Sequence, residues 1–123
     1  MSLTRIPHQA LAQGLEKLTG EVLSSVEFVA DYVQLRFNGP ILSAYTHPTV
    51  TSGRETKVWG KPGYRDALCA QIDRRVERTD VTDERASIIY ENGTVVSISL
   101  RDDDYRGSEA LKFSLDDDNL WVL

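Results

Sequence analysis

The chain has 123 residues, a formal net charge of −5 and a single cysteine, and 41% of its residues are hydrophobic. These values predict one globular domain over residues 1–123 and exclude a disordered chain. Because Cys69 has no second cysteine to pair with, an intramolecular disulfide is excluded and a reducing, cytoplasmic location is expected. The sequence predicts no signal peptide and no membrane span, since no apolar run approaches roughly 18 residues.

The acidic charge is concentrated in the last third of the chain. Residues 86–123 hold 3 basic and 8 acidic side chains. A protein that binds the phosphate backbone needs a basic patch, so nucleic-acid binding is not expected. The same charge permits a basic protein partner.

Two short helices are predicted. Pro7 is expected to begin the first helix and Gly20 to cap its end, and the second is expected from Gly63 to Arg74. The expected buried positions are Leu11, Leu15 and Leu18 in the first helix, and Tyr64, Leu68 and Ile72, with Cys69 beside them, in the second.

The clearest strand signal is the hairpin from Asp31 to Thr46, which turns at Asn38-Gly39. Apolar and polar residues alternate in it with the period of a half-buried strand. The expected register places Leu35 opposite Leu42 and Val33 opposite Ala44 on the core face, and Tyr32 opposite Tyr45 on the other face. A strand over Ser25–Ala30 precedes this hairpin, and residues 46–63 are expected to form a long loop with one short strand at Lys57–Trp59.

Two more hairpins follow, after a weak strand at Val76–Val81. In the hairpin around Asn92-Gly93, Ile89 is expected opposite Val96, with Tyr90 on the other face. In the last hairpin Leu115 is expected opposite Leu120, and Phe113 opposite Val122, so that Trp121 faces away from the core. The predicted fold class is therefore α+β: a strongly twisted antiparallel meander of about seven strands, with two short helices on one face, which could curl into a half-barrel.

The sequence predicts no metal site and no cofactor. Asp102-Asp103-Asp104 begins like a calcium loop, but Phe113 stands where the bidentate Glu is needed. No zinc-ligand spacing includes His8, His47 or Cys69. Turns explain the aspartates, because Asp is a common turn residue.

The segment Trp59 to Asp66, W-G-K-P-G-Y-R-D, joins aromatic and cationic side chains in a loop. Trp59, Tyr64 and Arg65 are candidate partner-binding residues, because these residue types are enriched at interface hot spots. The alternative is that Trp59 and Tyr64 only anchor the loop to the sheet.

The predicted outer face of the sheet carries Tyr32, Tyr45 and Trp121, accompanied by Ile41 and Leu123. Monomers rarely leave a large apolar patch uncovered. Either the sheet curls so that this face lines an interior, or the face meets another protein. The sequence predicts the second, as a symmetric homodimer through this face.

The segments D-Y-V-Q-L-R-F-N-G-P (31–40), G-Y-R-D-A-L (63–68) and E-A-L-K-F (109–113), with W-V at 121–122, resemble small bacterial proteins that have no assigned activity. In size and acidity the chain is also similar to immunity proteins that neutralise toxins. The resemblance implies no catalytic residue. The leading hypothesis is a non-enzymatic protein-interaction domain, and the alternative is a small enzyme or ligand-binding protein that uses the Trp59–Asp66 loop with His47.

Overall fold

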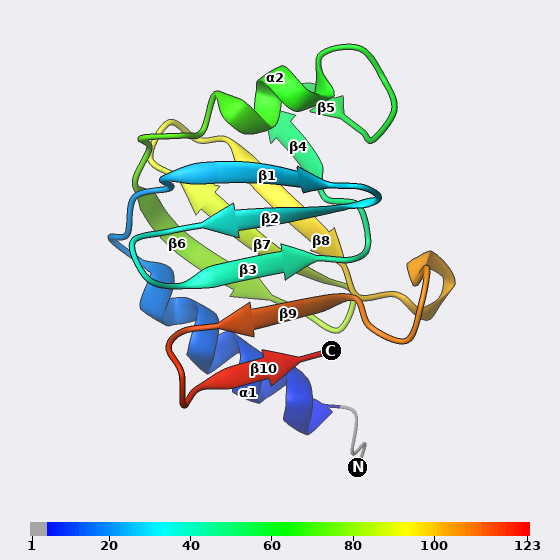
Figure 1. The fold of residues 1–123 in the computed structure, drawn as a ribbon. Helices are drawn as coiled ribbons and strands as arrows, with labels where there is room; N and C mark the ends of the chain where they lie inside the picture. Colours follow the sequence, from blue (N-terminus) through cyan, green and yellow to red (C-terminus); the bar gives the residue numbers. More distant parts are fainter. Residues whose placement is uncertain (1–4) are drawn as a thin grey trace.

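The computed structural model describes residues 5–123, with side chains from His8 onward, and contains two antiparallel sheets that face each other (Figure 1). The first sheet has five strands in the spatial order β1 (Ser25–Val29), β2 (Tyr32–Arg36), β3 (Ile41–Ala44), β9 (Leu111–Ser114) and β10 (Leu120–Val122). The second also has five, in the order β5 (Glu55–Lys57), β4 (Thr49–Ser52), β8 (Val95–Ser99), β7 (Arg85–Tyr90) and β6 (Val76–Val81). The chain is thus an α+β protein with two sheets, and neither sheet closes into a barrel.

The core lies between the sheets and is built from alternate residues of both. In β2, Val33 and Leu35 are fully buried, whereas their neighbours in the strand stay partly exposed. From the facing sheet, Ile88 and Ile98 are also fully buried and belong to the same apolar cluster. The period-2 pattern therefore sets which side of each strand meets the opposite sheet.

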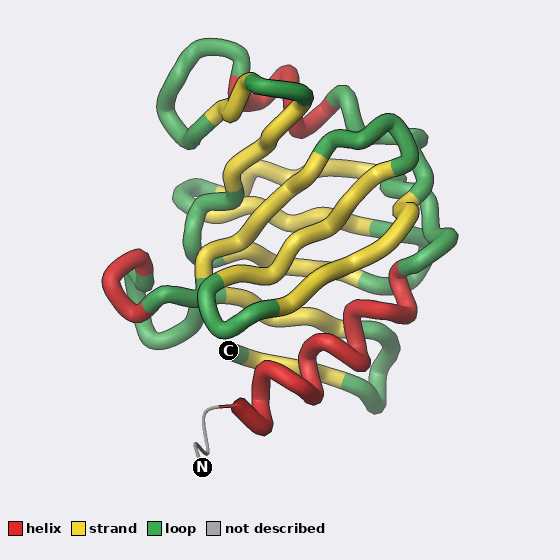
Figure 2. Tube along the Cα trace, turned by 180° about the vertical axis from the view of Figure 1, so that it is seen from behind, coloured by secondary structure: helices red, strands yellow, loops and turns green. Residues whose placement is uncertain are grey.

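The helices close the open sides of this sandwich. The helix α1 (Arg5–Leu15), continued by the 3-10 turn η1 (Glu16–Leu18), contacts both β6 and β10 (Figure 2). The short helix α2 (Tyr64–Cys69) contacts β1 and β4 on the opposite side. Each helix touches both sheets, so the prediction of two helices on one face of a single sheet is wrong.

The predicted single sheet of about seven strands is also wrong, because the chain crosses between sheets twice. It leaves the first sheet after β3 and returns after β8, so that β3 pairs with β9 rather than with the next strand in sequence. The two crossings lie together, since the Thr46 hydroxyl donates to the Ser99 carbonyl at 2.8 Å. Half of the expected loop at residues 46–63 is the hairpin of β4 and β5.

The predicted register of the central hairpin is confirmed. Leu35 pairs with Leu42 and Val33 with Ala44. The connection has four residues, and the Phe37 N–H donates to the Pro40 carbonyl at 2.8 Å. A loop with an even number of residues preserves the facing that a two-residue loop would give.

The predicted registers of the other two hairpins are wrong by one residue. Ile88, not Ile89, pairs with Val96, because the turn holds an additional residue and ends at Gly93 with φ +85°. Tyr90 is consequently buried in the core. In the last hairpin Trp121 pairs with Phe113, so that Leu120 and Val122 face outward in its place.

The second helix is shorter than expected. It ends at Cys69, which is exposed, and Ile72 lies beyond it with 38% of its surface exposed. Both expectations of burial are wrong, because the chain leaves the helical path before Asp73, which has φ +76°. The burial of Tyr64 and Leu68 is confirmed, as is that of all three leucines expected in the first helix.

Candidate functional site

A continuous strip of partly exposed side chains runs across one end of the sandwich. We call it the aromatic band, and it consists of Tyr32, Tyr45, Asp31, Arg106, His47 and Trp59. Four connections supply it: the β1–β2 turn, the crossing after β3, the loop between β5 and α2 that carries Trp59, and the loop that follows the 3-10 turn η2 (Asp102–Asp104). Because these connections meet at the same end of the molecule, residues far apart in sequence become neighbours.

The tyrosine pair forms the first part of the band. Tyr32 and Tyr45 lie side by side on the outer face of the first sheet, with ring centroids 5.2 Å apart and a tilt of 53°, as the hairpin register predicts. Partial burial, together with the nearby Glu109 carboxylate, raises the pKa of Tyr45. The Tyr45 hydroxyl is therefore a neutral, polar end of an amphipathic ring at neutral pH.

Arg106 forms the centre of the band. Its Nη1 lies 2.7 Å from the Asp31 carbonyl oxygen and 2.9 Å from Nε2 of His47, and its Nη2 lies 3.4 Å from the Asp31 carboxylate. Nε2 of His47 is itself 2.7 Å from the same Asp31 carbonyl. The guanidinium thus fastens the β1–β2 turn to the crossing after β3.

The protonation of His47 follows from these neighbours. Partial burial, and to a smaller extent the Arg106 guanidinium, lower the pKa of His47, and they outweigh the opposite effect of its bond to the Asp31 carbonyl. The Asp31 carbonyl can only accept a hydrogen bond, so Nε2 of His47 donates to it in the tautomer that carries the proton on Nε2. In the other neutral tautomer, with the proton on Nδ1, Nε2 accepts a hydrogen bond from Arg106. Neither contact supplies a nucleophile for His47 to activate.

Trp59 forms the far end of the band. Its indole stacks on the His47 ring with centroids 3.7 Å apart and planes within 5° of parallel. The Tyr64 ring meets the indole edge-on at 5.9 Å, and the Tyr64 hydroxyl donates to the Pro48 carbonyl at 2.6 Å. Tyr64 is almost completely buried, and burial raises its pKa. Tyr64 therefore anchors the loop, while Trp59 remains half-exposed.

Two predicted contact residues lie outside the band. Arg65 is exposed at the start of α2, and its guanidinium carbon sits 4.9 Å above the ring of Phe28 in β1. Trp121 packs inward, with its ring 5.5 Å from that of Phe113, so the outward facing expected for it is wrong. Leu123 likewise packs against the core, whereas Ile41 faces outward.

The part of the chain that the structure describes contains neither a cluster of metal-ligating residues nor a membrane-spanning helix. No group of three or more His, Cys, Asp or Glu residues there is placed to hold a metal ion. The aspartates of η2 form an exposed turn, as expected from the sequence. No helix among the described residues is long and apolar enough to span a membrane.

No protein-family model, curated protein or solved structure matches this chain. The aromatic band is therefore defined by geometry alone. Sequence reasoning found its four aromatic members but missed Asp31 and Arg106. These two residues are 75 positions apart, and nothing in the local pattern around either one indicates the contact.

Proposed function

We propose that this chain is a non-enzymatic protein-interaction domain that binds its partner through the aromatic band. The observation that carries the proposal is the position of Arg106, which joins the tyrosine pair to the His47–Trp59 stack through Asp31. Tyr, Trp and Arg are the residue types most enriched among interface hot spots. Here they form one connected surface that is accessible to a partner.

The band is also held in place before any partner arrives. Trp59 is fixed by stacking on His47 and by the Tyr64 edge beneath it, and Arg106 is fixed by its contacts with Asp31. A side chain that is already ordered loses less conformational entropy on binding. This preorganisation supports a role in recognition.

The charge around the band supports a partner with basic side chains, as in the immunity-like hypothesis. Asp31 and Glu109 flank the tyrosine pair. Basic groups of the partner would meet these carboxylates at the rim of the contact. Rim charges act mainly on the association rate and its salt dependence.

The test begins with affinity capture from the source cells, using the wild type and a Trp59→Ala variant as baits, followed by calorimetry with the purified partner. Tyr45→Ala and Arg106→Ala should each weaken binding by about tenfold or more, the effect of about 1.4 kcal/mol. Lys17→Ala is the control, because Lys17 is exposed in η1, beside β6 and outside the band. Equal capture by wild type and Trp59→Ala, or equal affinities of all variants, would exclude the band as the interface.

The partner could be a second copy of this chain, as the predicted homodimer requires. The apolar residues Ile41, Leu120 and Val122 do share the outer face with the tyrosine pair. However, the ion pair of Arg36 with Glu27, at 2.9 Å, lies on the same face and makes it partly polar. Light scattering coupled to size exclusion would give twice 13.8 kDa for a dimer, and Tyr45→Glu would shift it to a folded monomer. A wild-type monomer at tens of micromolar would exclude the homodimer.

A further inference from the structure

A polar hollow lies next to the aromatic band and shares His47 and Arg106 with it. The hollow is open, has a volume of about 440 Å³, and is also lined by residues at the ends of β7 and β8. Among its lining residues are Arg85, Arg101 and Arg106, together with the carboxylates of Glu84 and Asp104. Three guanidinium groups around one hollow are unexpected in a chain whose net charge is −5.

We propose that this hollow is a binding site for a small oxyanion, a carboxylate or a phosphate group. Guanidinium groups recognise both through paired N–H donors. The volume is within the range of small-molecule sites. The inference goes beyond the proposed protein contact, because a free anion is sufficient to occupy the site.

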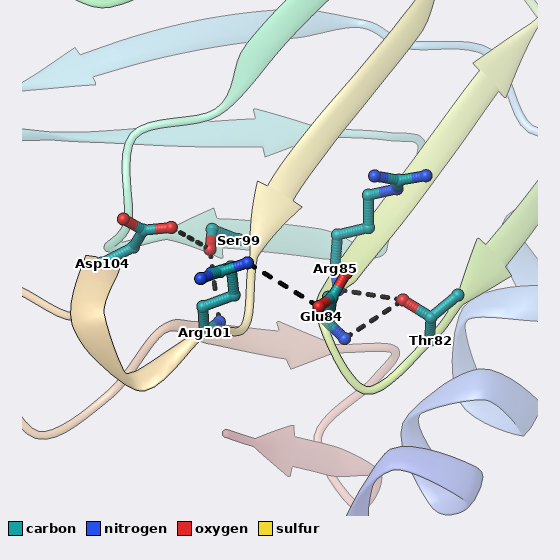
Figure 3. Close-up of polar contacts among 6 residues, drawn as sticks. All are labelled: Thr82, Glu84, Arg85, Ser99, Arg101 and Asp104. Carbon is teal, nitrogen blue, oxygen red and sulfur yellow. Dashed lines mark hydrogen bonds and ion pairs between the residues drawn. The ribbon is translucent and has the colours of Figure 1, made fainter.

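Arg85 is the main candidate to hold the anion. It is the first residue of β7, is exposed, and its side chain points away from the turn at Thr82 and Glu84 (Figure 3). Among the residues that the structure describes, its guanidinium has no carboxylate within ion-pair distance. Its donors are therefore available to a ligand.

Arg101 is held only weakly by Glu84. Its Nη1 lies 3.7 Å from the Glu84 carboxylate, and both side chains are more than half exposed (Figure 3). Exposed ion pairs of this kind contribute little to stability. The Thr82 hydroxyl accepts from the backbone N–H groups of Glu84 and Arg85 at 3.1 and 3.2 Å, and so fixes the turn that carries them. Glu84 thus occupies a position where it competes with an incoming anion.

The second carboxylate of the hollow is already engaged. Asp104 accepts from the Ser99 hydroxyl at 2.6 Å (Figure 3). Arg106, in contrast, is fixed by Asp31 at the edge of the hollow. The Thr49 hydroxyl lines the hollow and has no hydrogen-bond partner among the described residues, so it can donate to an anion. The hollow therefore holds three guanidinium groups against two carboxylates.

The proposal can be tested by titrating the ¹⁵N-labelled protein with inorganic phosphate and, separately, with succinate, at constant ionic strength adjusted with sodium chloride. The NMR chemical shifts of the backbone amides of Arg85, Ser99 and Arg101 are expected to change and then saturate as the anion is added. The expected dissociation constant of the anion is about 1 mM or lower. Tighter binding of phosphate identifies a phosphate-bearing ligand, and tighter binding of succinate a carboxylate.

Two neighbouring substitutions should act in opposite directions. Arg85→Gln should weaken binding by about fivefold or more, and Glu84→Gln should strengthen it because the competing carboxylate is removed. The matched controls are Arg54→Gln and Glu91→Gln, which make the same charge changes at exposed turns outside the hollow and should have little effect.

Shifts that do not saturate with either anion would overturn the proposal, as would equal effects of Arg54→Gln and Arg85→Gln. Trp59→Ala should leave anion binding unchanged, because Trp59 does not line the hollow. The two proposals can therefore fail separately. Equal partner capture by the wild type and Trp59→Ala rejects only the protein contact, and the absence of saturable anion binding in the wild type rejects only the anion site.

Discussion

Trp121 and Gly14 provide a direct test of how the last strand packs against α1. A Cβ atom added at Gly14 would lie 2.7 Å from an indole carbon of Trp121, closer than real Cβ contacts allow. Gly14 is buried in the last turn of α1. The position is therefore glycine because the ring rests on the helix backbone, and the substitution to test is Gly14→Ala.

Two effects of opposite sign determine the result. Alanine stabilises a helix by about 1 kcal/mol relative to glycine, whereas overpacking a filled site costs about 1 to 3 kcal/mol. We expect a net loss of about 1 kcal/mol in the wild type. In a Trp121→Val background the ring is absent, so the same substitution should stabilise by up to about 1 kcal/mol. The coupling energy between positions 14 and 121 in this double-mutant cycle should then be about 2 kcal/mol.

Urea unfolding of the wild type, Gly14→Ala, Trp121→Val and the double variant measures this coupling energy. The control is Gln13→Ala, at the exposed position before Gly14, which should change the free energy of unfolding little. If Gly14→Ala stabilised the wild type and the Trp121→Val protein equally, Trp121 would not rest on α1. That result would support the register in which Trp121 faces away from the core.

Three further predictions concern the core and His47. Leu35→Ala should cost roughly 2 to 5 kcal/mol in chemical denaturation, because Leu35 is fully buried, and Gln34→Ala on the opposite face should cost much less; equal losses would contradict the facing of β2. Tyr90→Phe should be neutral or stabilising, because the buried Tyr90 hydroxyl has no partner among the described residues; a loss above about 1 kcal/mol would indicate a hydrogen bond. The folded-state pKa of His47 lies below its unfolded value of about 6.5, so the unfolded chain binds this proton more readily, and stability should fall as the pH drops through about 6.5. His47→Gln should reduce this loss, and an unchanged pH profile would refute the assignment.

The sequence predicted the central hairpin because its signal is local. Its strands alternate regularly, and loops of two or four residues leave the same side chains on the core face. The other two hairpins carry equally regular strands, but an additional residue in each turn reversed the facing of one strand. Tyr90 and Trp121 were therefore predicted on the wrong face, although both lie in correctly predicted strands.

The division into two sheets could not be predicted in this way. The crossing after β3 looks like the start of a loop, and the pairing of β3 with β9 depends on residues about 70 positions apart. The same limit applies to the candidate site. The aromatic residue types were visible in the sequence, but Asp31 and Arg106 become partners only because the β1–β2 turn and the second crossing meet at the same end of the sandwich.

Both proposed binding features depend on the crossings rather than on the sheets. His47 follows directly after Thr46, whose buried hydroxyl joins the first crossing to the second at Ser99. Arg101, Asp104 and Arg106 all lie on the second crossing. The sandwich core holds the strand ends rigid, while the crossings need to satisfy only a few polar contacts of their own. Tyr45, Arg85 and Arg106 lie outside the core cluster, so their substitutions should change binding while leaving the fold intact. Trp59 packs against that cluster, so circular dichroism should show that Trp59→Ala is folded before its binding is compared with that of the wild type.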